Sequence, residues 1–191
     1  MSGGRHCQSE IYSSDIWSHF IYIFELPVPN LYLKSGEVGV NSADEGEISP
    51  LHVAAANGQE DVVSLLLSRG ANVDQRTGSG WTPLHQASFH GHNTVTQALV
   101  SAGAEVNKRN KYGATPLNMA AAGGHLATAR LLMTSGSSPE AAASAQYKVC
   151  PTPTMTAALH GHDGILHALL EAGAKSDKVY LYKYINDSVK S

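Results

Sequence analysis

Apolar residues along this chain recur with the spacing of amphipathic helices. Two segments carry the pattern most clearly: Val62, Val63, Leu66 and Leu67, and later Ile165, Leu166, Leu169 and Leu170. Positions i, i+1, i+4 and i+5 form a broad apolar stripe on one side of a helix. Each stripe follows a run of small residues, such as Val53-Ala54-Ala55-Ala56, which lets neighbouring helices approach closely. The pattern therefore predicts pairs of short helices, the first with small side chains and the second amphipathic.

Three sets of sequence markers repeat in step with this pattern. The first set is Ser49-Pro50-Leu51-His52, Thr82-Pro83-Leu84-His85, Thr115-Pro116-Leu117-Asn118 and Thr152-Pro153-Thr154-Met155, whose first residues are 33, 33 and 37 positions apart. The second is Gly58-Gln59, Gly91-His92, Gly124-His125 and Gly161-His162, and the third is Gly70-Ala71, Gly103-Ala104, Gly136-Ser137 and Gly173-Ala174. A shared period of this length indicates stacked supersecondary units, of which at least three are needed to bury a core.

Each marker has a physical role in a helix-turn-helix unit. The hydroxyl of the leading Ser or Thr suits an N-cap, because it accepts a hydrogen bond from an amide of the first turn. The proline that follows suits the first helical position, where no N–H is required. The glycine of the second marker ends the first helix, and that of the third marker ends the second helix, since glycine tolerates the left-handed conformation. A turn or finger then leads to the next cap.

These markers closely resemble those of the ankyrin repeat. The resemblance implies an all-α fold, an ankyrin-repeat solenoid of helix-turn-helix units with finger loops, over residues 44–178. The four units would span about 44–76, 77–109, 110–146 and 147–178. Five of the ten histidines are then residues that the repeat pattern itself requires: His52, His85, His92, His125 and His162. The family's TPLH histidine is structural, so the resemblance implies that it ties neighbouring loops by hydrogen bonds.

The junction between the third and fourth units departs from the pattern by four extra residues within Ser137 to Pro151. The segment Ser138 to Ala143 favours a short helical turn there. The fourth unit also has Thr154-Met155 in place of Leu-His. Two interpretations stay open: a terminal capping unit whose outer face meets water, or a specialised binding finger.

Residues 1–43 do not match a full repeat, and residues 179–191 form a short tail without a motif. Leu31 to Gly36 resembles Leu65 to Gly70, which suggests the second helix of a degenerate capping half-repeat, shortened because Pro27 and Pro29 block a helix upstream. The alternatives are a disordered leader, although it is unusually apolar for one, or a segment that is foreign to the natural domain or packs on a missing upstream repeat.

The composition of the chain bears on its cellular compartment and on the kinds of partner it can bind. The chain is 42% hydrophobic and 15% charged, with a formal net charge of −3, so nothing at the level of the whole chain draws it to nucleic acid or to an anionic membrane. Cys7 and Cys150 are too few for a disulfide framework, which favours a reducing compartment. The apolar stretch Ile16 to Phe24 is too short to span a bilayer, and we see no cleavable signal sequence. We expect a cytoplasmic location, with the nucleus as an alternative.

The sequence does not favour catalysis. No P-loop, dinucleotide fingerprint, nucleophile elbow or kinase signature occurs. The histidine groups around His90 and His162 lack Cys or Glu at a familiar ligand spacing, and Cys150 has no evident base beside it. We therefore expect no enzyme activity, no cofactor and no metal.

Protein binding is the function that the resemblance implies. Ankyrin-like proteins contact partners through finger tips and through the first helices, which line a concave face. The corresponding variable positions are Arg76, Trp81, Phe89, His90, Arg109, Lys111 and Tyr112. Trp, Tyr and Arg often dominate interface energy, and we expect Trp81 to contribute to binding but little to folding. The other interpretation is that Trp81 covers a neighbouring finger.

We therefore predict an adaptor or scaffold that binds another protein, identity unknown, as a monomeric domain without membrane insertion. The alternative is a targeting or substrate-recognition part of a larger enzyme assembly, such as a ubiquitin ligase. A catalytic or oligomerising domain beyond Ser191 in a longer natural chain would distinguish the two.

Asn107 is a candidate modification site. Leu99, Glu105 and Val106 precede it at the positions required by the intracellular asparaginyl hydroxylase that acts on ankyrin repeats. This pattern is again a resemblance. The competing interpretation is that Asn107 stabilises its turn by bonding nearby backbone, as Asp74 would in the first unit.

Overall fold

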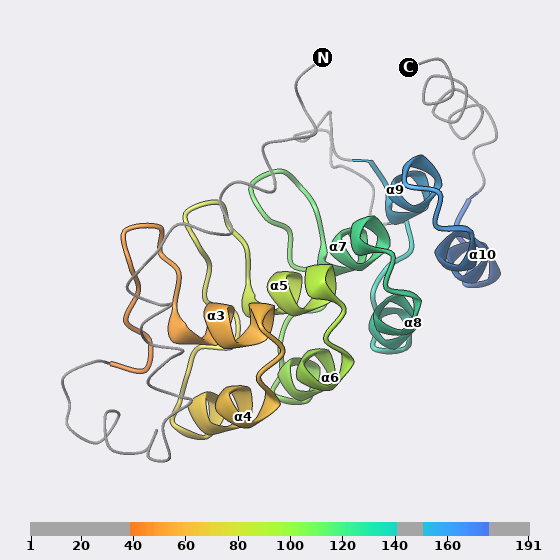
Figure 1. Ribbon diagram of the computed structural model, residues 1–191. Helices are drawn as coiled ribbons and strands as arrows, with labels where there is room; N and C mark the ends of the chain where they lie inside the picture. The colour runs from red at the N-terminus through yellow and green to blue at the C-terminus, as the bar shows by residue number, and fades with distance from the viewer. Residues whose placement is uncertain (1–38, 141–150, 176–191) are drawn as a thin grey trace.

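The described chain is built from helix pairs stacked side by side. The computed structural model describes residues 39–140 and 151–175, and within these ranges it contains helices and no strands (Figure 1). The first helices of the pairs are α3 (Pro50–Ala56), α5 (Pro83–His90), α7 (Pro116–Gly123) and α9 (Pro153–Leu159). The second helices are α4 (Glu60–Ser68), α6 (Asn93–Ser101), α8 (Leu126–Thr134) and α10 (Asp163–Glu171). The predicted all-α solenoid is confirmed.

The helix starts form as the local chemistry predicts. Each first helix begins at the proline of its marker. Thr82 Oγ1 accepts a hydrogen bond from the amide of His85 at 3.4 Å, and Thr152 Oγ1 accepts one from the amide of Met155 at 3.2 Å. These caps satisfy amides that lack a partner within the helix, which fixes where the helix starts.

Gly91 shows how one unit packs on the next. It ends α5 with φ at 75°, a left-handed conformation that L side chains rarely adopt. A Cβ at this position would lie 2.4 Å from Nδ1 of His125, which approaches from the following unit. The ring of His125 is held there because its Nε2 donates to the carbonyl of Phe89 at 3.0 Å. Glycine is therefore required here both by the backbone conformation and by the close packing of the two units.

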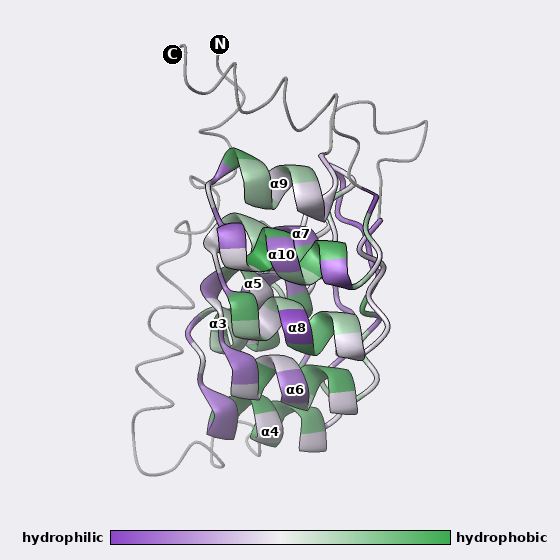
Figure 2. Ribbon diagram, turned by 90° about the vertical axis from the view of Figure 1, so that its right-hand side faces the viewer, coloured by the Kyte–Doolittle hydropathy of each residue, from purple (hydrophilic) through white to green (hydrophobic). Residues whose placement is uncertain are grey.

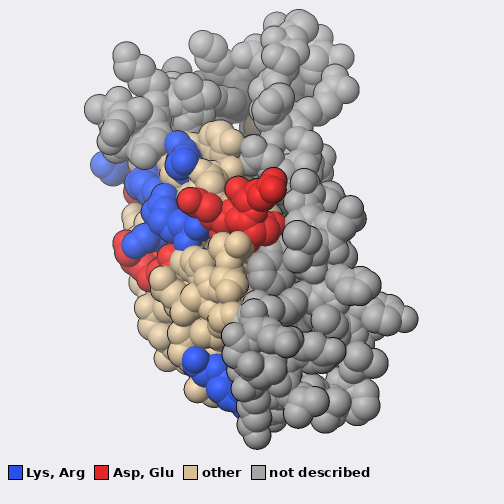
Figure 3. All heavy atoms as spheres, turned by 90° about the vertical axis from the view of Figure 1, so that its left-hand side faces the viewer, with Lys and Arg blue, Asp and Glu red and all other residues tan. Residues whose placement is uncertain are grey.

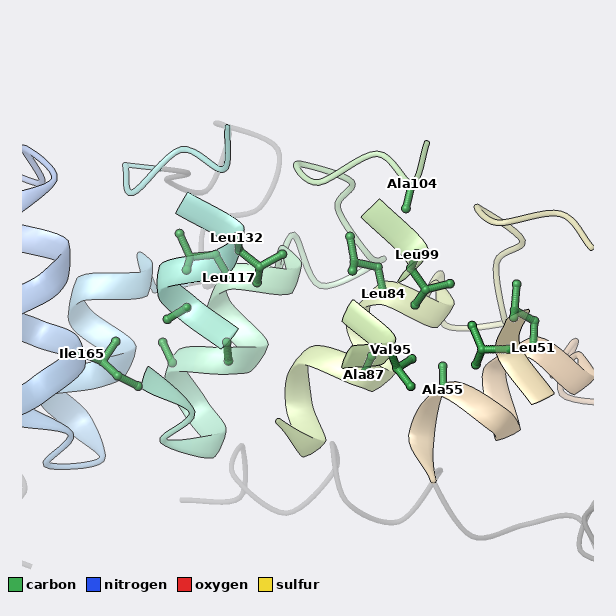
Figure 4. Close-up of a cluster of buried hydrophobic side chains, with 14 of the residues drawn as sticks. Leu51, Ala55, Leu84, Ala87, Val95, Leu99, Ala104, Leu117, Leu132 and Ile165 are labelled. Carbon is green, nitrogen blue, oxygen red and sulfur yellow. The ribbon is translucent and has the colours of Figure 1, made fainter. Parts of the chain in front are cut away.

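The hydrophobic core runs continuously from one helix pair to the next. Leu84, Val95, Leu99 and Leu117 are fully buried, and Figure 4 shows them among similar side chains from successive units. Fully burying such a side chain contributes about 1.5–3 kcal/mol. Seen from the C-terminal end, hydrophobic and hydrophilic segments alternate along the helices (Figure 2), because each helix turns only part of its surface to the core.

A second set of contacts joins the turns that follow the second helices. We call Asn41, Asp74, Asn107 and Glu140, which are spaced by 33 residues, the turn ladder. Asn41 donates to the carbonyl of Gly70 at 3.2 Å and accepts from the amide of Asn72 at 2.7 Å. Asp74 accepts from the amide of Glu105 at 3.1 Å, and Glu140 accepts from the amide of Lys175. Each unit is thereby clasped to the next at the same place.

Several predictions lie outside the described residues. They concern the half-repeat at residues 31–36, the tail, both cysteines and residues 141–150 of the enlarged junction. Of the helical turn expected at Ser138 to Ala143, only residues 138–140 are described, and of these Pro139 and Glu140 form a turn. The fourth unit is nevertheless formed, with α9 and α10 in the same arrangement as the earlier pairs (Figure 1).

Candidate protein-binding surface

The fingers form a connected row above the first helices. We call residues 43–48, 76–81 and 109–114 fingers 1, 2 and 3. The amide of Gly78 donates to the carbonyl of Gly46 at 2.9 Å, which joins finger 2 to finger 1. The amide of Lys111 donates to the carbonyl of Ser79 at 3.0 Å, which joins finger 3 to finger 2. These backbone bonds hold the tips in a fixed relation to one another.

Two guanidinium groups lie at the junction of fingers 2 and 3. Nη2 of Arg76 donates to the carbonyl of Arg109 at 2.9 Å, and Nη1 of Arg109 donates to the carbonyl of Gly113 at 2.9 Å. Arg76 also lies close over Gly80, where a Cβ would be 2.6 Å from Nη2. A guanidinium has five N–H donors, so each side chain is oriented by its bond to a backbone carbonyl and keeps donors for a partner.

The tip of finger 3 exposes an aromatic ring beside a cation. Asn110 is buried, and its Oδ1 accepts from the amides of Tyr112 at 3.0 Å and Ala114 at 2.9 Å. This internal cap directs the intervening residues outward, and Tyr112 is 48% exposed, with Lys111 exposed beside it. Lys108, by contrast, is paired with Glu105 at 2.7 Å. The structure thus brings Arg76, Arg109, Lys111 and Tyr112 together on fingers 2 and 3.

The burial of Trp81 contradicts our expectation that this side chain contributes little to folding. We predicted that packing does not require this side chain, but it is only 7% exposed. Its ring lies 5.9 Å from that of His85 and 6.1 Å, edge to face, from that of Phe89. The residue before the capping threonine lies where a finger meets its helix, so a large ring here is enclosed by its own unit. Trp81 is a packing residue, and its truncation would be costly to the fold.

Phe89 and His90 lie at the end of α5 and are partly buried. Their rings meet edge to face at 5.2 Å, and the ring of His90 stacks on that of His92 at 6.0 Å. Burial lowers the pKa of His90, with further lowering from nearby His92 and His125, so the ring is uncharged at neutral pH. Nε2 of His90 and Oε1 of Gln86 have no hydrogen-bond partner among the described residues. Both atoms are buried, so neither is open to a partner.

His85 serves the scaffold, as the resemblance implied. Nε2 of His85 donates to the carbonyl of Ala114 in the next finger at 3.0 Å, while Nδ1 accepts from the amide of Thr82 at 3.2 Å. His52 makes the same contacts with Trp81 and Ser49. Desolvation by burial lowers the pKa of each ring to about 4, despite opposing hydrogen bonds to backbone carbonyls. Both rings are therefore neutral and fully used in structure, which argues against a catalytic role.

Asn118 takes the place of this histidine in the third unit. Its Nδ2 donates to the carbonyl of Pro151 at 2.8 Å, and its Oδ1 accepts from the amide of Thr115 at 3.0 Å. The amide group thus reproduces both bonds of the neutral imidazole with a group that does not titrate. The sequence showed that asparagine replaces histidine here, but not that the asparagine makes the same two hydrogen bonds.

Asn107 is the third member of the turn ladder. Its Nδ2 donates to the carbonyl of Gly136 at 3.0 Å, and its Oδ1 accepts from the amide of Ser138 at 3.0 Å. The side chain is exposed, yet both of its polar atoms bond the following turn. The residue therefore has the structural role that we weighed against modification, and hydroxylation remains a prediction.

Two acidic residues of finger 1 were absent from the predicted surface. Glu45 and Glu47 are exposed at its tip, and Glu47 has φ at 60°. The 33-residue period supplied the signal, because it aligns Glu47 with Gly80 and Gly113, which are also left-handed at 79° and 83°. Glutamate at a position that favours glycine is conspicuous once the three fingers are aligned.

Metal-binding clusters and membrane-spanning helices are both absent from the described residues. They contain no group of three or more His, Cys, Asp or Glu side chains that could hold a metal ion. Within the same part of the chain, no helix combines the length and apolar character needed to cross a bilayer.

Helix pairs stacked in a row, with loops that project to one side, define the class of helical repeat proteins. A family model described as ankyrin repeats, in three copies, matches residues 27–110 and 95–179, and the chain belongs to the ankyrin-repeat family. Ankyrin repeats are generally modules of protein–protein interaction and are typically non-catalytic.

A curated protein is also similar over part of the chain. It is Delta-latroinsectotoxin-Lt1a of Latrodectus tredecimguttatus, which is 32% identical over 65 residues, or 34% of this chain. The aligned part is only 5% of the length of that relative.

Proposed function

We propose that this protein is a non-catalytic adaptor or scaffold that binds a partner protein through its fingers and the concave face of its first helices. The observation that carries the proposal is the group on fingers 2 and 3. There, Arg76 and Arg109 are held in place by hydrogen bonds beside the exposed ring of Tyr112. Rigid aromatic and guanidinium side chains lose little conformational entropy on binding and are common interface anchors.

The second part of the surface is the end of α5. Phe89 is only partly buried there and offers apolar area to a partner, with the partly buried ring of His90 against it. We propose a cytoplasmic location and a monomeric domain. A substrate-recognition role in a larger assembly, such as a ubiquitin ligase, would use the same surface.

The proposal is tested by affinity capture of proteins on the immobilised full chain, followed by quantitative mass spectrometry. Native protein is compared with Tyr112→Ala and Phe89→Ala variants whose folding is checked by circular dichroism. We expect a protein retained by the native chain and depleted on the variants, with a loss of about 2 kcal/mol if Tyr112 is an anchor. A native chain that retains no protein above an empty matrix would refute the proposal.

A further inference from the structure

We infer that the row of fingers recognises a bipolar segment of its partner, with basic side chains over finger 1 and acidic side chains over fingers 2 and 3. The inference rests on the proposed function and adds the chemistry and orientation of the bound segment. It begins from the alignment of the three fingers by the 33-residue period. The third residue of each finger is Glu45, Gly78 and Lys111 in turn, so the charge at this position reverses from finger 1 to finger 3.

The charges at each end belong to side chains that are available to a partner. Glu45 and Glu47 are exposed, whereas Asp44 of the same finger is occupied in accepting from the amides of Gly46 and Ile48 at 2.9 and 2.8 Å. At the other end Lys111 is exposed. Figure 3 shows the face at the α3 and α4 end of the stack. Acidic and basic side chains lie in adjoining groups on its upper side, where the fingers are, and the surface below them is largely uncharged.

These opposite charges do not neutralise one another within the described residues. The ion pair found there joins Lys108 to Glu105, and none joins Glu45 or Glu47 to Arg76, Arg109 or Lys111. The fingers are also bonded through Gly78 and Lys111, so the two ends cannot collapse together without breaking backbone hydrogen bonds. A fixed separation of charge is a pattern that a complementary segment can match in one direction only.

Glu47 supplies an independent observation. Its left-handed backbone is matched by glycines in the other two fingers, and a non-glycine residue in this conformation is strained. Glu47 therefore places a carboxylate at a position where the backbone conformation favours glycine. Strain of this kind tends to occur at functional positions, and here the strained residue doubles the negative charge of the tip.

The same arrangement disfavours nucleic acid as the occupant. A polyanion laid along the row would be attracted by Arg76, Arg109 and Lys111 but repelled by Glu45 and Glu47 at the adjoining finger. A protein segment with both signs of charge avoids this repulsion. Its acidic side chains would receive bonds from the guanidinium groups, which suit carboxylates through paired N–H donors.

The test is a selection of random dodecapeptides displayed on phage against the immobilised full chain. Enriched peptides are synthesised with a fluorophore, and their affinity is measured by fluorescence anisotropy. We expect the enriched peptides to carry basic residues toward one end and acidic residues toward the other. The double variant Glu45→Lys/Glu47→Lys and the single variant Lys111→Glu should each weaken them about fivefold or more, and added salt should do the same. Arg130→Glu, an exposed change on α8, is the matched control and should leave affinity unchanged.

Two further arms separate charge recognition from a nonspecific effect of the substitutions. Peptides with lysine in place of their acidic residues should bind Lys111→Glu better than they bind the native chain. Glu47→Gly should raise the melting temperature by about 2–4 °C, because glycine relieves the strained backbone, while it weakens the peptides. A purely structural Glu47 would leave peptide affinity unchanged.

Three outcomes would contradict the inference, and they distinguish its failure from failure of the proposed function. Enriched peptides that ignore every charge reversal would overturn the inference and leave the proposed protein-binding function standing. Tight binding of a labelled single-stranded RNA homopolymer, lost in Lys111→Glu, would overturn it in favour of nucleic acid. Absence of any enriched peptide, together with no captured protein in the experiment above, would remove the proposed function and the inference with it.

Discussion

Replacing His85 with asparagine should weaken the acid sensitivity of this protein without disturbing its fold. The third unit already contains the replacement, because Asn118 makes the two bonds that His85 makes, to the amide of its own cap and to a carbonyl of the next finger. We therefore expect His85→Asn to cost about 1 kcal/mol or less at pH 7.5, since the bonds are kept and little volume is lost.

The pH dependence follows from the pKa of the buried ring. The pKa of His85 is lowered from 6.5 to about 4 in the folded state, chiefly by burial, so the unfolded chain takes up the proton first as the pH falls. The stabilisation is complete above pH 6.5 and is lost progressively toward pH 4. One pKa unit corresponds to about 1.4 kcal/mol, which gives a loss of about 2 kcal/mol between pH 6.5 and 4.5 from His85 alone. His52, whose pKa is also lowered to about 4, adds a loss of similar size.

The assay is urea denaturation followed by circular dichroism at several pH values between 7.5 and 4.5. Carboxylates titrate in the same range, so the informative quantity is the difference in slope between His85→Asn and the native chain. His167→Asn, a change at an exposed histidine, is the control, and Asn118→His should steepen the dependence. A His85→Asn variant with the native slope would refute the assignment of acid sensitivity to the buried ring.

Three further changes test the packing between units, the burial of Trp81 and the modification of Asn107. Gly91→Ala and Gly103→Ala both place a side chain at positive φ, which costs about 1–2 kcal/mol, but only the first meets a histidine ring. Gly91→Ala should therefore be the less stable in urea by at least about 1 kcal/mol, and equal stabilities would contradict the packing of His125 on Gly91. Trp81→Ala should lower the free energy of unfolding by about 3–5 kcal/mol, and a loss well below this range would restore the interpretation of Trp81 as a surface anchor. Co-expression with the active asparaginyl hydroxylase should add a single oxygen to Asn107 and none to Asn107→Ala, as read by peptide mass spectrometry. Since Leu99 is fully buried and Asn107 is bonded to Gly136 and Ser138, this reaction requires local opening, and an unmodified peptide at full coverage would end the proposal.

The features that could be predicted from the sequence depend on local chemistry. A Thr-Pro pair fixes a helix start and a glycine fixes its end, so the helices appear where the markers place them. Trp81 could not be judged in this way, because its burial depends on how a finger folds back on α5. The role of Asn118 was equally hidden, since its equivalence to histidine exists only once Pro151 is brought within reach. The change of charge from Glu45 to Lys111 can be read from the sequence. It indicates a binding surface only because hydrogen bonds hold the fingers side by side.

The turn ladder also bears on how the stack would respond to force. Asn41 and Asn107 each grip the following turn with a donor and an acceptor, whereas the ionised carboxylate of Asp74 can only accept, so it cannot bond the carbonyl of Gly103. The carboxylate of Glu140 likewise only accepts, so the joints at Asp74 and Glu140 each lack the donated bond that Asn41 and Asn107 make. Under bending or tension these two joints, between the first and second units and between the third and fourth, would separate before the joints made by Asn41 and Asn107.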